Sequence, residues 1–410
     1  MSAISEVAAA SASLKAYPAF WRYWITRLSS AFGFQMLSVA VGWQVYELSG
    51  DPFSLGLIGL AQFIPSVLLA LPAGHVADQV HRRNIVMVTQ SCQWIALLLL
   101  VGGSWFGLLS EYWILLLVFI IGVFKAFEFP ALKSMLPALV PDEVLPRALA
   151  VDSSGIQMAS IAGPALGGLL YIGGPVVAYG LSALLYLISI IALTGLHYRH
   201  QIHKKQPMNL ENLFAGVRFI RARPVILGVI SLDLFAVLLG GATALLPIFA
   251  KDILHTGPWG LGLLRAAPAV GALLMSFWLA RHTLERKVGK IMFASVAGFG
   301  VATLVFALST NLYLSLIALF ALGAFDMVSM VIRGALVQLE TPDEMRGRVT
   351  AVNSIFINTS NQLGEFESGM LAAALGAVGA TVIGGVGTLV VVAAWMWMFP
   401  VIRQREKLKE

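Results

Sequence analysis

Long apolar runs are the feature that most constrains how this chain folds. A helix that crosses a bilayer needs roughly 20 apolar residues to span a hydrocarbon core of about 30 Å. Hydrophobic residues make up 58% of the sequence and charged residues only 12%, so runs of that length recur along the chain. We predict an all-α membrane protein with about twelve transmembrane helices, at approximately 20–48, 54–77, 84–107, 112–132, 146–172, 175–197, 224–250, 258–280, 290–309, 312–333, 347–375 and 379–402.

One segment of the sequence occurs twice. Residues 125–169 and 326–370 align without a gap at an offset of 201, which places the Pro-Asp-Glu of 141–143 on that of 342–344. A repeat of this length predicts two tandem halves related by pseudo-symmetry. The predicted organisation is a six-helix half over 1–198, a cytoplasmic linker over 199–223 and a second six-helix half over 224–410.

The basic residues gather at alternate loops and at the helix ends beside them. Clusters occur at 82–83, 199–205, 281–290 and 403–409, whereas the intervening loops carry few charges. By the positive-inside rule, this pattern predicts that both termini and the central loop are cytoplasmic. We interpret the net charge of +6 as orientation information, and we expect no nucleic-acid partner.

The ends and the rare residue types add two exclusions. The N-terminal segment lacks the basic start, apolar core and cleavage site of a secretory signal, so we expect the first span to be retained. Cys92 is the single cysteine, which excludes an intrachain disulfide. His197, His200 and His203 are spaced three apart within the basic linker, and we interpret them as part of it. We therefore expect no metal site.

Polar residues inside the apolar runs are the candidate functional residues of the first half. Gln35, Ser38 and Gly42 form one face of the first helix, and Lys125 and Glu128 share a face of the fourth. A charge deep in a span costs on the order of 2.5 to 3.5 kcal/mol, so it must face a partner or water. Helix packing explains the first set equally well, and a buried ion pair between Lys125 and Glu128 is the structural alternative.

The second half carries two carboxylates within spans. Asp233 lies well inside its run, and burial of a carboxylate without a counter-ion favours its protonated form, the property that a proton carrier needs. Arg265 in the next span is a candidate partner for Asp233. Asp326 occupies the place in the repeat that Lys125 has in the first half, and Arg333 lies two turns further along the same face. An ion pair within or between helices is the alternative for Asp326.

A polar stripe follows the second copy of the repeat. Asn358, Asn361, Gln362 and Glu365 recur at helical spacing on one face. Four polar groups on one face are costly against lipid, so we expect them to line a cavity.

The loop after the second helix reads GHVADQVHRRN over 74–84 and resembles the loop signature of the major facilitator superfamily. The matching residues include Gly74, Asp78, Arg82 and Arg83, whereas Gln79 departs from the usual arginine. The resemblance implies a major facilitator fold and a cytoplasmic latch in which these acidic and basic residues separate and re-form as the halves move. Charge that merely sets topology is the alternative.

The fifth helix contains GPALGG, which resembles the antiporter motif of the same superfamily. The matching residues are Gly163, Pro164, Gly167 and Gly168. The resemblance favours export over uptake, and close helix packing is the alternative. Lys125 stands where relatives often carry an arginine implicated in proton coupling, but lysine lacks the planar fork of arginine.

Several longer runs, such as FGFQMLSVAVGWQVYELSG and QLETPDEMRGRVTAVNSIFIN, resemble the bacterial branch of siderophore exporters and macrolide efflux pumps. The resemblance implies a monomeric proton antiporter in a bacterial inner membrane that exports a bulky polar metabolite. Its proton-coupling candidates are Asp233, Asp326, Glu365, Glu128 and Lys125. Its candidate cavity residues are Gln35, Trp43, Lys125, Arg265, Asn358, Asn361, Gln362 and Glu365.

Other functions stay open at this stage. The sequence has no P-loop and no clustered His, Cys and carboxylate residues, so we expect neither an ATP-driven pump nor an enzyme, and no cofactor beyond the proton gradient. Its expected partners are a small-molecule substrate, protons and the lipid bilayer. The alternatives are a multidrug or macrolide efflux pump, a proton-symport importer and a transport-inactive membrane sensor.

Overall fold

The computed structural model describes residues 14–196, 210–282 and 286–408, apart from the side chains of Leu71, Asp78 and residues 210–213. The described backbone is helical with short connections and contains no strand. Helices satisfy all their backbone hydrogen bonds within one segment, which is the requirement that a bilayer imposes. The fold class predicted from the apolar runs is confirmed.

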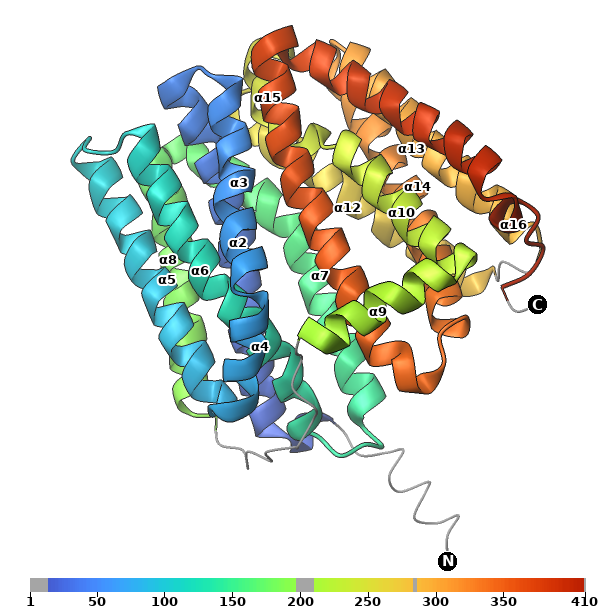
Figure 1. Ribbon diagram of the computed structural model, residues 1–410. Helices are drawn as coiled ribbons and strands as arrows, with labels where there is room; N and C mark the ends of the chain where they lie inside the picture. The colour runs from blue at the N-terminus through green and yellow to red at the C-terminus, as the bar shows by residue number, and fades with distance from the viewer. Residues whose placement is uncertain (1–13, 197–209, 283–285, 409–410) are drawn as a thin grey trace, which may run out of the picture. The chain divides into compact units, whose positions relative to one another are not determined.

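The first half contains six of the predicted spans. They are α2 (Pro18–Ser49), α3 (Pro52–Leu68) continued by α4 (Ala70–Gln79), α5 (Arg82–Trp105), α6 (Glu111–Met135), α7 (Leu145–Leu170) and α8 (Pro175–Thr194). The second predicted span breaks at Leu69, because Pro72 has no backbone N–H to donate to the Leu68 carbonyl four residues earlier. In Figure 1, α5, α6 and α8 run side by side, and α5 contacts both of the others.

The second half contains the other six. They are α10 (Pro224–Leu239), continued by η4 (Ala242–Leu245), α11 (Leu246–Ile248) and η5 (Phe249–Ile253), then α12 (Gly257–Arg281), α13 (Val288–Leu308), α14 (Leu312–Leu339) and α15 (Asp343–Met398), followed by α16 (Pro400–Arg403). The seventh span is irregular where Gly240, Gly241 and Pro247 interrupt it. η5 is a π-helical turn.

α15 covers two predicted spans. The chain bends at Gly376, whose backbone angles φ 77° and ψ 161° are open to glycine and strained for other residues. Nine helices of the described residues are long and apolar enough to cross a membrane, counting α15 once. α2 and the α3–α4 pair cover the two remaining predicted spans, so the number of about twelve holds.

Two compact units make up the chain. Unit 1 comprises Met1–Val41 and Ile64–Met208, and unit 2 comprises Gly42–Phe63 and Asn209–Glu410. Unit 2 thus includes a short piece of the first half of the sequence. Within unit 2, the Tyr46 hydroxyl donates a hydrogen bond to Asp252, and the rings of Phe53 and Phe366 meet edge to face.

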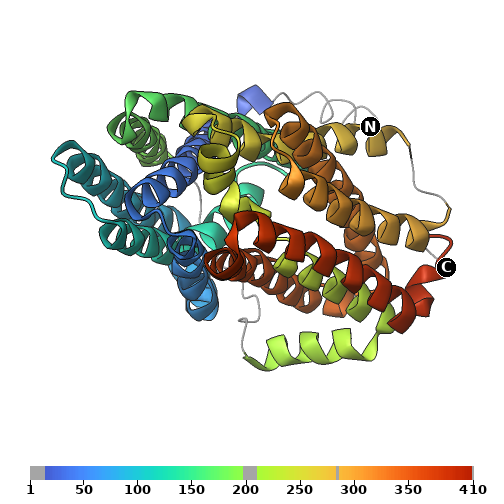
Figure 2. The ribbon, with the colours of Figure 1, turned by 90° about the horizontal axis from the view of Figure 1, so that it is seen from above.

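The segment predicted as a linker contains one described helix, α9 (Leu210–Ala222). It lies along α15 in unit 2 (Figures 1 and 2), and Gly216 sits directly against the Arg348 carbonyl and the Val352 side chain. Ile220 is buried in the apolar core of unit 2.

Gly167→Ala tests the packing of α7 on α2. A Cβ atom at Gly167 would lie 2.9 Å from the Met36 Cα and 3.0 Å from the Met36 carbonyl oxygen, so backbone must move to admit it. We expect a loss of about 1 to 3 kcal/mol of stability, seen as a lower melting temperature in detergent. Gly180→Ala is the control, because a Cβ there meets nothing within 4 Å. Equal melting temperatures for the two variants would contradict the packing described.

Candidate functional site

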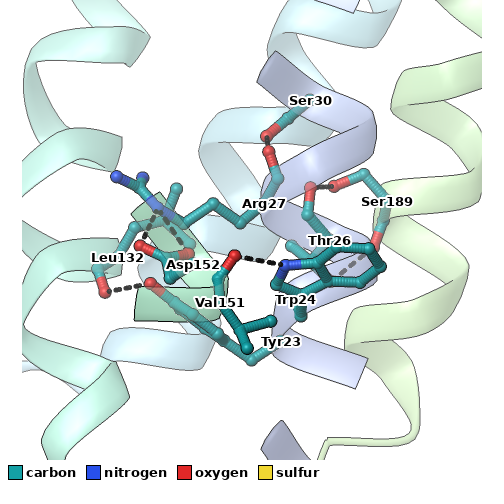
Figure 3. Close-up of polar contacts among 9 residues, drawn as sticks. All are labelled: Tyr23, Trp24, Thr26, Arg27, Ser30, Leu132, Val151, Asp152 and Ser189. Atoms are coloured by element: carbon teal, nitrogen blue, oxygen red, sulfur yellow. Dashed lines mark hydrogen bonds and ion pairs between the residues drawn. The ribbon is translucent and has the colours of Figure 1, made fainter. Parts of the chain in front are cut away.

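Unit 1 contains a small cavity with charged walls between α2 and α6. Its lining residues are Arg27, Ser30, Ala31, Lys125, Glu128, Phe129 and Leu132. Arg27 Nε lies 3.2 Å from each carboxylate oxygen of Asp152 on α7 (Figure 3). The Lys125 ammonium lies 3.8 Å from the ring centroid of Phe34. The cavity has space for a few water molecules.

Glu128 is held by two glutamines of α5. Its Oε1 accepts a hydrogen bond of 2.9 Å from Gln90 Nε2, and its Oε2 accepts one of 2.7 Å from Gln93 Nε2. All three side chains are buried. The sequence alternative of an ion pair with Lys125 is therefore corrected: among the described residues, Glu128 bonds to amides and Lys125 faces an aromatic ring.

α8 completes this network. The Ser189 hydroxyl lies 2.7 Å from Gln90 Oε1, and the Tyr186 hydroxyl donates a 3.0 Å bond to Gln93 Oε1. Thr26 of α2 and Ser189 exchange two further bonds, shown in part in Figure 3. The sequence analysis missed Gln90 and Gln93, although two amides spaced three apart inside an apolar span were a signal of the same kind as Lys125 and Glu128.

The arginines of the loop signature bind helix ends within unit 1. Arg82 Nη1 donates a 2.8 Å hydrogen bond to the Ser134 carbonyl at the end of α6, and Arg83 Nε donates a 3.0 Å bond to the Leu193 carbonyl at the end of α8. Terminal carbonyls of a helix have no intrahelical partner, and cations stabilise that end. The Asp78 side chain lies outside the described residues, so its predicted part in a latch stays a prediction.

The glycines of α7 lie against α2. A Cβ on Gly163 would meet the Gln35 side chain, and Gly167 faces the Met36 backbone. Pro164 and Gly168 are also buried. The motif therefore forms a close helix contact, and its predicted relation to antiport stays a prediction. Gln35 packs against this contact.

In unit 2, α10 and α14 are joined by a buried ion pair between Arg333 and Asp233. Both residues are buried, each less than one-tenth exposed as a whole. The expected pairing of Asp233 with Arg265 is therefore wrong. Spacing along the chain could not reveal it, because the partner depends on how α10 and α14 are rotated about their axes.

Asp326 shares a small cavity with Asp233, the carboxylate of this ion pair. The cavity is lined by Asp233, Ala236, Val237, Val296, Phe299, Phe325, Asp326 and Ser329, and it has room for roughly one water molecule. No lysine, arginine or histidine of the described residues forms an ion pair with Asp326. Arg333 has paired with the carboxylate of the neighbouring helix instead.

Arg265 and Glu365 form a second charged group in unit 2. Each acts electrostatically on the other, between α12 and α15. A Cβ on Gly42 would lie 3.2 Å from Arg265 Nη2, and one on Gly59 would lie 3.2 Å from Glu365 Oε2. These close contacts bring two charged candidates of the predicted cavity together against the backbone of α2 and α3.

The other predicted cavity residues differ in exposure. Trp43 is buried, Gln362 is half-buried, and Asn358 and Asn361 are exposed. Asn361 Nδ2 donates a 3.0 Å hydrogen bond to the Ile357 carbonyl one turn earlier. Their role in a substrate cavity stays a prediction. Within 14–196, 210–282 and 286–408, no three potential metal ligands gather, and the three linker histidines lie outside those ranges.

Buried charges and small polar cavities within membrane-spanning helices are typical features of membrane transport proteins. The comparisons agree. Residues 9–409 match the family model described as transmembrane secretion effector. The chain therefore belongs to that family, within the major facilitator superfamily, and is a transporter and not an enzyme.

Two curated relatives share the name enterobactin exporter EntS. Those of Citrobacter koseri and Shigella dysenteriae are each 27% identical over 387 residues, which cover 92% of this chain and 91% of the relative. A mutant of the nucleoside transporter NupG superposes with a TM-score of 0.72 at 15% identity, covering 93% of this chain and all of that one. A bacterial homologue of the human lysosomal transporter Spinster gives 0.73 at 13%, covering 96% and 97%. At these identities the structures show the fold alone.

Asp233→Asn tests the buried ion pair. It leaves the Arg333 charge buried without its partner, and breaking such a pair costs about 3 to 5 kcal/mol. Adding Arg333→Gln removes the stranded charge, so the double variant should regain most of the melting temperature in detergent. If the two losses simply add, the pairing described here is wrong.

Proposed function

We propose that this protein exports a bulky polar small molecule from the cytoplasm across a bacterial inner membrane, driven by proton antiport. The observation that carries the proposal is the place of Asp326, half-buried in a small cavity that it shares with Asp233, whose arginine partner is already engaged. A carboxylate in such a place can exchange a proton with little rearrangement of neighbouring charge.

The proposed cycle uses the two groups of unit 2. A proton from outside binds Asp326, and the loss of its charge removes the cost of holding an ionised carboxylate in this small cavity. Glu365 beside Arg265 is the second proposed proton site. Neutralisation of these carboxylates lowers the cost of moving them through apolar surroundings, which is what reorientation of a transporter requires.

The proposed substrate is a siderophore, enterobactin or a similar chelator. The support is the name of the 27% identical relatives, together with the GPALGG segment that favours export. In unit 1, Lys125 suits a catecholate or carboxylate, and the aromatic rings of Phe34 and Phe129 beside it suit stacking. Arg265 is a separate cationic candidate in unit 2.

Transport by purified protein in liposomes tests the antiport. We expect Asp326→Asn and Glu365→Gln each to abolish substrate movement driven by a pH gradient, because neither amide can bind and release the proton. Asp343→Asn is the matched control, since that carboxylate is 85% exposed at the start of α15. Undiminished transport in both buried variants would overturn the assignment.

Substrate identity needs its own measurement. A strain without this protein should retain the siderophore inside the cell and release less into the medium. A macrolide in the same liposome assay tests the competing hypothesis of drug efflux. Transport of the macrolide and not the siderophore would replace the proposed substrate but leave the antiport intact.

A further inference from the structure

The buried network around Glu128 contains one hydroxyl hydrogen that has two acceptors within reach. Ser189 Oγ lies 2.7 Å from Gln90 Oε1 and 2.8 Å from the Thr26 carbonyl oxygen. A serine hydroxyl has a single hydrogen and can donate to one acceptor at a time. When the hydrogen points to Gln90, the amide oxygen of Gln90 faces Ser189. When it points to the Thr26 carbonyl, the amide nitrogen of Gln90 can face Ser189 instead.

Two complete hydrogen-bond arrangements follow. In the first, Glu128 is ionised, the Gln90 amide donates to its Oε1, and Ser189 donates to Gln90 Oε1. In the second, Glu128 carries a proton on Oε1 and donates it to Gln90 Oε1. The Gln90 amide, turned over by half a turn, then donates to Ser189 Oγ, and the Ser189 hydrogen moves to the Thr26 carbonyl.

No hydrogen bond is lost between the two arrangements. This matters because an unsatisfied buried polar group costs about 1 to 3 kcal/mol. A buried carboxylate surrounded by fixed donors would incur that cost on taking up a proton, because the new hydroxyl would point at an N–H or O–H donor and find no acceptor. Here the Gln90 amide turns its oxygen toward the new Glu128 hydroxyl, and Ser189 changes from donor to acceptor toward Gln90, so every donor has an acceptor.

Gln93 has no such freedom. Its Oε1 accepts the Tyr186 hydroxyl, and this is the one side-chain hydrogen bond that the hydroxyl makes among the described residues. The Gln93 amide therefore donates to Glu128 Oε2 in both arrangements. Gln90 and Gln93 lie one turn apart on α5 but behave differently. The amide of Gln93 keeps one orientation, whereas the amide of Gln90 can turn over.

Glu128 lines the cavity of unit 1, which has space for water and has charged walls. The charged groups that face it are Lys125 of its own helix and Arg27 of α2 with its partner Asp152 of α7. The neutral groups that face it are the Tyr186 hydroxyl of α8 and the Gln90 and Gln93 amides of α5, and His75 of α4 is exposed. With Glu128 ionised, the charges of Arg27, Asp152, Lys125 and Glu128 cancel.

We propose that Glu128 is a proton-binding site of this transporter and that Gln90 and Ser189 are the positioning residues that let it switch between ionised and protonated forms. The proton comes from cavity water and resides on Glu128 Oε1. The cavity of Lys125 and Arg27 then gains one net positive charge and holds an anionic group more tightly. The assignment of this switch to transport rests on the proposed proton antiport.

Infrared difference spectra between mildly alkaline and mildly acidic pH test the switch directly on the purified protein. With isotope-labelled glutamine, we expect two changes on acidification: a carboxylic acid band appears, and one glutamine amide band shifts. Glu128→Gln should remove both. Glu143→Gln, an exposed carboxylate, should remove neither.

Two matched variants distinguish a glutamine that turns over when Glu128 is protonated from one that only donates a hydrogen bond to it. Gln90→Met should abolish the amide shift, whereas Gln93→Met should keep it, because Gln93 donates to Glu128 Oε2 in both arrangements. A Glu128 band that never appears, or an amide shift that survives Gln90→Met, overturns the proposal. Should Gln90→Met fail to fold, Ser189→Ala replaces it and should likewise abolish the shift.

The same spectra keep this inference apart from the antiport. If liposomes show no proton-driven transport but Glu128 titrates with the Gln90 shift, the proton site stands and the antiport falls. If transport is proton-driven and the Glu128 band is absent, the site proposed here falls and coupling remains with unit 2.

Discussion

The cost of placing charge in an apolar membrane interior governs this structure. Each ionisable side chain within the described spans that we singled out is compensated in its own way. Asp233 has an arginine, Glu128 has two amides, Lys125 has an aromatic ring, and Asp326 has a small cavity. The ion pair with Arg333 fixes Asp233 as a charged group, whereas Glu128 and Asp326 form no ion pair among the described residues. That difference separates the structural charges from the candidates for proton exchange.

The helices and their number could be predicted because the bilayer sets the length of an apolar run. The partners of the buried charges could not. Sequence spacing places Asp326 and Arg333 on one face, yet Arg333 pairs with Asp233 across helices. Likewise, Lys125 and Glu128 lie on one face of α6 but contact different neighbouring helices. Lys125 contacts Phe34 of α2, and Glu128 accepts a hydrogen bond from Gln93 of α5.

The candidate site was predicted in part for the same reason. Charges in spans were conspicuous, so Asp233, Asp326, Glu128 and Lys125 were found. Gln90 and Gln93 were not, because an uncharged amide in a span costs less and attracts less notice. Their importance lies in hydrogen-bond direction, which depends on Ser189 and Tyr186 nearly a hundred residues further along the chain. Contacts of that range follow from the fold and not from local pattern.

The central claim is that substrate leaves as protons enter. Simultaneous recording of internal pH and substrate release from liposomes containing the purified protein tests it most directly. The account predicts that substrate placed on one side moves protons in the opposite direction, with the two fluxes in a constant ratio. Substrate movement with no proton flux, or with protons moving in the same direction, would contradict it.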